Sequence, residues 1–131
     1  MATAKILIVD DEAQTRKVLH DYLFSRIECD IIEAENGYEA IEQLKKQTVD
    51  ILLTDMKMPG IRGADVIQKA QEISKETAVI VLTKWDGVEV SKQVKQSGAD
   101  YIPKPFSLKI VLSKVEEKLK AMGKWNGKVA N

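Results

Sequence analysis

Asp55 is the residue of this chain whose position in the sequence is most suggestive of chemistry. It ends a mostly apolar run from Val49 that contains β-branched residues, which is typical of a strand buried on both faces. The Met-Pro-Gly loop at 58–60 can continue neither a strand nor a helix. An acid at the carboxyl end of a buried strand lies at the rim of the core, where α/β proteins place their functional groups. Taken alone, Asp55 would more simply cap the next helix or solvate the loop, so the other strand ends decide its meaning.

Three other predicted strands also end in polar residues. These residues are Asp10 and Asp11 after the run Lys5–Val9, Thr83 after Ala78–Leu82, and Lys104 after Tyr101–Ile102. Because the carboxyl ends of parallel strands lie along one edge of a sheet, we expect three carboxylates, a hydroxyl and an ammonium to converge. Crowded carboxylates repel one another, so such a cluster is stable only if it holds a cation or shares protons.

The predicted cluster has the chemistry of a site that handles phosphoryl groups. Hard oxygen ligands suit Mg²⁺ (or Mn²⁺), and the sequence offers no His or Cys at these positions for zinc. The metal and Lys104 would neutralise phosphoryl oxygens, and Thr83 could hydrogen-bond another of them. Asp55 is already ionised, so it needs no base to attack phosphorus and form an acyl phosphate.

Hydrophobic periodicity along the chain predicts five strands that alternate with five helices. Strands are expected at 5–9, 29–33, 49–55, 78–82 and 101–102, and helical spacing follows at 18–23, 40–44, 66–73, 88–96 and 108–119. This alternation indicates an α/β fold with a parallel sheet covered on both faces. The first, third and fourth strands are the most apolar and belong at the centre. The prediction is a doubly wound, flavodoxin-like sheet with strand order 2-1-3-4-5.

Composition limits the classes of protein to which the chain can belong. Its 131 residues fit one domain, expected over 1–122, followed by an exposed and mobile tail over 123–131 that is rich in Gly and Lys. Twenty basic and twenty acidic residues balance, which argues against direct binding of nucleic acid. No apolar run is long enough for insertion into a membrane, and the residues before the first strand are too few for a signal peptide. The single cysteine, Cys29, favours a reducing cytoplasm and a role as a small buried apolar residue.

An ordered set of motifs covers the chain from about Lys5 to Leu119. Its members are Asp10-Asp11, Asp55, Met58-Pro59, Gly63, Thr83, Gly98-Ala99, Tyr101 and Lys104-Pro105. Each pair alone would be weak evidence, but the full set in this order resembles the receiver domain of two-component response regulators, and in particular the stand-alone, chemotaxis-type regulators. The strand order of the receiver fold is the one expected above.

The resemblance implies a role for each motif residue. Asp55 would accept a phosphoryl group, while Asp11, Asp55 and the backbone carbonyl of Lys57 would bind Mg²⁺ directly and Asp10 would act through water. Lys104 would hold the phosphoryl group, and its peptide bond to Pro105 would be cis.

The resemblance also implies partners and a switch. The phosphoryl donor would be a sensor histidine kinase or a histidine phosphotransfer protein. Thr83 would swing towards the phosphoryl group and Tyr101 would turn inward into the vacated space, which would change the surface of helix 4, strand 5 and helix 5. That surface would bind an output protein of unknown identity, or a second phosphorylated copy of the chain in a homodimer.

The residues after Thr83 depart from the family pattern, in which a small residue usually follows. Here Lys84 and the bulky Trp85 follow, and Lys57 adds a further cation. Both lysines can be read as simply solvated; the functional hypothesis is that Lys84 and Trp85 shield the acyl phosphate and slow its hydrolysis. The lysine-rich last helix can likewise be read as a solvated face, or as a docking surface for an acidic partner or for a second copy of the chain.

Three other functions compete with a phosphoacceptor switch. A pseudo-receiver would keep the fold as a phosphorylation-independent interaction module, but such proteins typically lose an acid or the lysine, and none is lost here. A phosphatase of the haloacid-dehalogenase type needs an acid two residues after the nucleophile, where this chain has Lys57. A flavin carrier needs a phosphate loop where Asp10-Asp11-Glu12 would repel phosphate. We therefore expect self-catalysed phosphorylation and dephosphorylation rather than enzymatic turnover, in a stand-alone receiver rather than a fragment.

Overall fold

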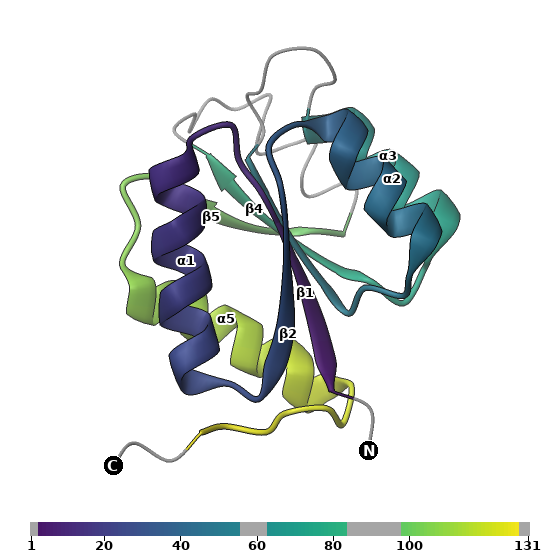
Figure 1. Ribbon diagram of the computed structural model, residues 1–131. Helices are drawn as coiled ribbons and strands as arrows, with labels where there is room; N and C mark the ends of the chain where they lie inside the picture. Colours follow the sequence, from purple (N-terminus) through teal and green to yellow (C-terminus); the bar gives the residue numbers. More distant parts are fainter. Residues whose placement is uncertain (1–2, 56–62, 84–97, 129–131) are drawn as a thin grey trace.

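The computed structural model describes residues 3–55, 63–83 and 98–128, apart from the side chains of 63, 64 and 83. Its strands form one parallel sheet in the order β2-β1-β3-β4-β5, as predicted. The strands are β1 (Ala4–Val9), β2 (Cys29–Ala34), β3 (Ile51–Asp55), β4 (Ala78–Thr83) and β5 (Asp100–Pro103). The sheet has two ends, which we call the carboxyl edge and the amino edge after the ends of the strands that lie there (Figure 1).

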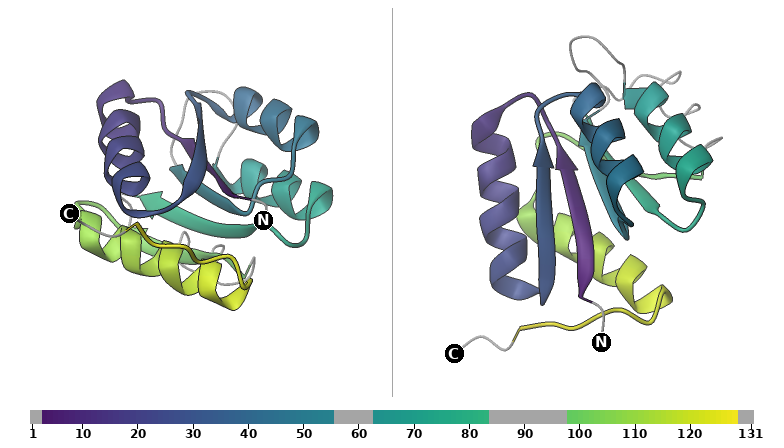
Figure 2. Two further views of the ribbon diagram at one scale, coloured as in Figure 1. Left: turned by 60° about the horizontal axis from the view of Figure 1, so that its bottom comes forward. Right: turned by 45° about the vertical axis from the view of Figure 1, so that its right-hand side comes forward.

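Helices cover both faces of the sheet, as Figures 1 and 2 show. They are α1 (Ala13–Arg26), α2 (Gly37–Lys46), α3 (Gly63–Ile73) and α5 (Leu108–Ala121). One core cluster joins α1 and α5 to the first face of the sheet, and a second joins α2 and α3 to the other face. The helix predicted at 88–96 lies outside the described residues. The doubly wound α/β architecture is confirmed.

The central strands are buried on both faces because their side chains alternate between the two clusters. Ile6 and Ile8 of β1 belong to the cluster beneath α1 and α5, whereas Leu7 and Val9 belong to the cluster beneath α2 and α3. Parallel strands covered on both faces are expected to be continuously apolar in this way. The outer strands β2 and β5 are more exposed and more polar. Their mixed composition is the reason that the sequence predicted them as the two outer strands.

Polar side chains and a glycine mark several helix ends. Asn36 accepts a hydrogen bond from the backbone N–H of Glu39 and caps α2, and Ser107 does the same for Lys109 at the start of α5. Gly98, predicted as a helix C-cap, has a φ of 79°, a left-handed conformation that favours glycine. Within the described residues, no helix combines the length and hydropathy needed to cross a membrane.

The segment 123–128, part of the stretch expected to form a mobile tail, runs beside the α1–β2 corner at the amino edge (Figure 1). Gly127 forms an antiparallel bridge with Ile27. Two main-chain hydrogen bonds flank this bridge, from Glu28 to Asn126 at 2.8 Å and from Lys128 to Arg26 at 2.8 Å. The half-buried Trp125 packs against the core cluster beneath α1 and α5. This packing joins the end of α5 to the end of α1.

Candidate functional site

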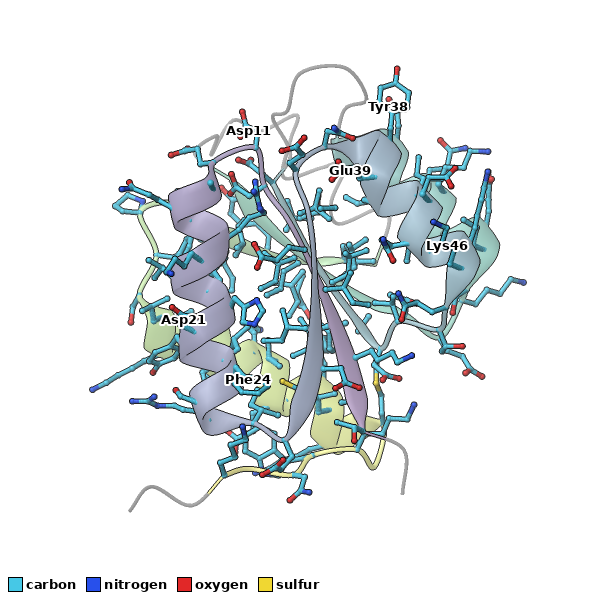
Figure 3. All side chains as sticks on the ribbon, in the orientation of Figure 1. Asp11, Asp21, Phe24, Tyr38, Glu39 and Lys46 are labelled. Carbon is cyan, nitrogen blue, oxygen red and sulfur yellow. The ribbon has the colours of Figure 1, made fainter. Side chains whose placement is uncertain are left out.

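Three aspartates meet at the carboxyl edge, where the sequence predicted that they would. Each of Asp10, Asp11 and Asp55 offers a carboxylate oxygen, and these oxygens lie within 4.8 Å of one another. Asp10 directly follows β1 and Asp55 ends β3, and they are only 1% and 8% exposed, whereas Asp11 is exposed. Figure 3 labels Asp11 at the start of α1, on the side of the sheet where β1 ends. The cluster is therefore rooted in the core and open to solvent on one side.

Lys104 connects two of these carboxylates. Its Nζ lies 3.0 Å from Asp55 Oδ2 and 3.2 Å from Asp10 Oδ2, and its side chain is 8% exposed. Lys104 follows β5, so its two contacts link the carboxyl ends of β1, β3 and β5. The Lys104–Pro105 peptide bond is cis, as the resemblance implied.

The charges in this cluster do not balance. Burial lowers the pKa of Lys104, but its hydrogen bond and charge interaction with Asp55, joined by the charge of Asp10, outweigh burial and raise the pKa overall. The pKa of the Asp11 carboxyl is raised by burial and by the neighbouring charge of Asp10. Among the described residues, three carboxylates against one ammonium leave an excess of negative charge, which a further cation would neutralise.

The oxygen chemistry of the cluster fits a hard divalent cation. Asp10, Asp11 and Asp55 all present carboxylate oxygens, and two of the three are held in place by burial. Mg²⁺ is typically bound by one or two carboxylates together with water and phosphate oxygens. The cluster offers carboxylates enough for such a site, and its exposed side leaves space for water or a phosphoryl group.

Comparison with known proteins identifies the family. The family model that describes the response regulator receiver domain matches residues 6–116 of the sequence. The chain belongs to this family.

Relatives and solved structures agree with this assignment. The receiver domain is 30% identical to sporulation initiation phosphotransferase F of Bacillus subtilis (strain 168), covering 91% of this chain and 96% of that protein. It is 34% identical to a cyclic di-GMP phosphodiesterase of Thermotoga maritima, but it covers only 31% of that longer protein. Among solved structures, a CheY-like receiver domain protein from Methanospirillum hungatei JF-1 matches 94% of this chain and 98% of its own, with a TM-score of 0.87 and 27% identity. Receiver domains are signalling modules of two-component and phosphorelay systems.

The other predicted site residues occupy defined places in the receiver fold, or lie outside the described part of it. Thr83 is the last residue of β4, opposite Pro103 of β5, although its side chain is not described. Tyr101 lies half-buried in β5 opposite Val81 and packs against the cluster beneath α2 and α3. Lys57, Lys84 and Trp85 lie outside the described residues. The backbone thus places Thr83 at the same edge as the acidic cluster.

A groove runs from the acidic site of the receiver along α1. Its first part, about 560 Å³, is lined by Glu12, Thr15, Lys104, Pro105 and Phe106. A second hollow of about 290 Å³ shares Thr15 and Phe106 and extends to Val18, which is 51% exposed. The two hollows therefore adjoin at Thr15 and Phe106 and together reach from Val18 to Lys104.

Sequence reasoning missed a basic residue at this site. The Nη1 of Arg16 donates a hydrogen bond to the main-chain carbonyl of Asp10 at 2.6 Å, and its Nε lies 3.2 Å from Glu33 Oε1. Arg16 lies six residues after Asp10, just before the helical spacing predicted at 18–23, and this position offers no signal by itself that its side chain would turn back to the strand end.

Proposed function

We propose that this receiver domain accepts a phosphoryl group on Asp55 from a sensor histidine kinase or a histidine phosphotransfer protein. The observation that carries the proposal is the bridge from Lys104 to Asp55 and Asp10 inside a cluster with excess negative charge. The described part of this site keeps the Asp55 carboxylate, a potential nucleophile, beside an ammonium that can bind a phosphoryl oxygen.

Phosphoryl transfer would use the residues of the cluster in separate roles. A carboxylate oxygen of Asp55 attacks phosphorus, and the phosphorus–nitrogen bond of the donor phosphohistidine breaks, returning its electron pair to the imidazole nitrogen. Lys104 moves its hydrogen bonds from the carboxylates to a phosphoryl oxygen. Asp10, Asp11 and Asp55, with the backbone carbonyl of Lys57, would hold Mg²⁺ (or Mn²⁺), which supplies further positive charge against the phosphoryl oxygens. Hydrolysis of the acyl phosphate resets the domain without turnover of an external substrate.

The donor would approach along the groove beside α1. Val18 is 51% exposed at one end of the groove, and Phe106 lines both of its parts. Large exposed apolar side chains beside a polar site are typical of a protein interface. A histidine presented from a helix in this groove would meet Lys104 and then Asp55, in the cytoplasm where we expect the protein to act.

The output would follow from Thr83 and Tyr101. Thr83 ends β4 at the acidic edge, and Tyr101 is half-buried in the adjacent β5. Movement of Thr83 towards the phosphoryl group would favour the inward rotamer of Tyr101 and shift the population of the surface formed by helix 4, β5 and α5. An output protein, or a second phosphorylated copy of the chain, would bind this altered surface.

Intact-protein mass spectrometry tests the proposal. After incubation with acetyl phosphate and Mg²⁺, the wild type is expected to gain one phosphoryl group, while Asp55→Asn and an EDTA-treated sample gain none. The half-life of the adduct in Lys84→Ala then tests shielding of the acyl phosphate, because an unchanged half-life rejects it. If neither the folded wild type nor Lys84→Ala forms an adduct, the chain is a pseudo-receiver.

A further inference from the structure

The site contains a contact that the ligand set does not explain. Arg16 projects from α1 back to the end of β1, and its side chain is only 15% exposed. One end of its guanidinium binds the Asp10 carbonyl at 2.6 Å, and its Nε pairs with Glu33 Oε1 at 3.2 Å. A nearly buried arginine that joins a strand end, a helix and a neighbouring strand has a fixed position and a definite geometric effect.

The Asp10 carbonyl is a sensitive place for such a contact. The other polar atoms of Asp10 are already bound: its N–H to Ala34 at 3.2 Å, Oδ1 to the N–H of Glu12 at 2.9 Å, and Oδ2 to Lys104 at 3.2 Å. The peptide unit between Asp10 and Asp11 is planar, so the direction of the Asp10 carbonyl also fixes where the Asp11 N–H and Cα lie. Arg16 therefore orients the backbone that carries the exposed carboxylate of the cluster.

Glu33 holds Arg16 in this orientation. It belongs to β2, beside α1 (Figure 2), and its second oxygen, Oε2, lies 2.8 Å from Nδ1 of His20. Both carboxylate oxygens of Glu33 are thus engaged by side chains of α1. The next residue, Ala34, accepts the hydrogen bond from the Asp10 N–H. The end of β2 therefore contacts the β1–α1 turn in two ways, through the main-chain carbonyl of Ala34 and through the Glu33–Arg16 ion pair.

We propose that Arg16 is a positioning residue of the acidic site, and that Glu33 acts through it, so that the affinity for a divalent cation depends on these two residues although neither is a ligand. The inference rests on the proposed function, because it assumes that the cluster binds a cation. A planar guanidinium can reach the carbonyl and the carboxylate at once, whereas the single ammonium of lysine cannot reproduce both contacts. Hydrogen-bond partners outside a ligand set typically change metal affinity by about 10- to 100-fold.

The test measures Mn²⁺ binding by electron paramagnetic resonance, without a phosphoryl donor, in the full chain. The variants are Arg16→Met, Arg16→Lys, Glu33→Gln and the double variant Arg16→Met/Glu33→Gln. Arg26→Met is the matched control, because Arg26 is on the same helix but stacks on Tyr22, with 4.3 Å between its Cζ and the ring centroid. Backbone amide NMR shifts of Asp10, Asp11 and Glu12 in EDTA give a metal-free readout of the turn.

We expect Arg16→Met to weaken Mn²⁺ binding about 10-fold or more and to shift the three amide signals, whereas Arg26→Met does neither. Arg16→Lys should recover only part of the affinity, and the double variant should lose little more than Arg16→Met alone. Wild-type Mn²⁺ affinity in Arg16→Met overturns the inference. Full recovery of affinity in Arg16→Lys would show that only the positive charge matters and would overturn the positioning role. Additive losses of affinity in the double variant would overturn the role of Glu33. A wild type that binds no Mn²⁺ contradicts the proposed site itself, while a wild type that binds Mn²⁺ but takes no phosphoryl group contradicts only the phosphoacceptor function.

Discussion

The two edges of the sheet each contain a buried aspartate paired with a lysine, but the two pairs differ in what surrounds them. At the carboxyl edge, Lys104 serves Asp55 and Asp10 while Asp11 adds a third carboxylate. At the amino edge, Asp50 has its charge matched: Oδ1 lies 2.5 Å from the Nζ of Lys124, and Oδ2 accepts the backbone N–H of Lys5 at 2.8 Å.

We expect this difference to distinguish an ion pair that only stabilises the fold from one that also takes part in phosphoryl transfer. A buried carboxylate whose oxygens are all bound contributes to folding because its removal leaves buried donors without acceptors. A cluster with surplus negative charge destabilises the fold, and binding of a cation offsets this cost. An Asp–Lys pair alone therefore says less about the role of a site than the number of charged groups around that pair.

Substituting the aspartate at each edge should change the free energy of unfolding differently at the two edges. Asp50→Ala is expected to lower the free energy of unfolding by about 3 kcal/mol, chiefly because the Lys5 N–H loses its acceptor. Asp55→Asn should leave the stability equal to wild type or higher in EDTA, because it removes one of three crowded charges. Urea denaturation at pH 7 measures both. Equal losses in the two variants would show that the carboxyl edge is as structural as the amino edge.

Titration of the buried Cys29 thiol, at the start of β2, should test how well the amino edge is packed. Burial raises the pKa of Cys29 to about 11 from its ordinary 9.0. The unfolded chain ionises first, so the stability that the neutral thiol contributes is present below pH 9 and is lost as the pH rises through about 11. The loss is about 3 kcal/mol, because each unit of pKa corresponds to about 1.4 kcal/mol. Urea denaturation of wild type and Cys29→Ala from pH 8 to 11.5 measures it, because other titrations cancel in the difference; a constant difference would contradict the prediction.

The contribution of the segment 123–128 should be smaller and confined to the amino edge. Trp125→Ala is expected to lower the free energy of unfolding by about 2 kcal/mol, since the ring is half-buried against the core. It should also speed the labelling of Cys29 by a thiol reagent in the native state, while phosphorylation stays unchanged. Lys120→Met, at an exposed residue whose Nζ lies 5.9 Å from the centroid of the Trp125 ring, is the control and should change little. A stable Trp125→Ala with slow Cys29 labelling would mean that the segment contributes nothing to the fold.

The sequence predicted the carboxyl edge well because topology alone brings it together. Once the strand order is known, Asp10, Asp55 and Lys104 must meet, since each lies at the carboxyl end of a strand. The amino edge carried no comparable signal. Asp50 looks like an ordinary strand-start residue, and its partner Lys124 is 74 positions away in a segment of glycines and lysines. Contacts of this kind depend on where two chain ends finally pack, which periodicity does not encode.

Side-chain pairing was similarly hidden along α5. The sequence left its lysines as either a solvated face or a docking surface. The structure pairs Lys114 and Lys118 with Asp100, and Lys120 with Glu116 at 3.2 Å. Much of the positive charge is thus matched within the domain, which weakens the case for an acidic docking partner. The Arg16–Glu33 pair was missed for the same reason, because only the fold brings the outer strand beside α1.

The placement of the described chain ends has a practical consequence. β1 begins at Ala4, and the last described residue, Lys128, lies beside Arg26, so both ends are at the amino edge (Figure 1). A fluorophore or a sensor-chip tether attached through either end would leave the acidic site facing the bulk solution. The same molecule could then be immobilised and titrated with a phosphoryl donor without the support blocking access.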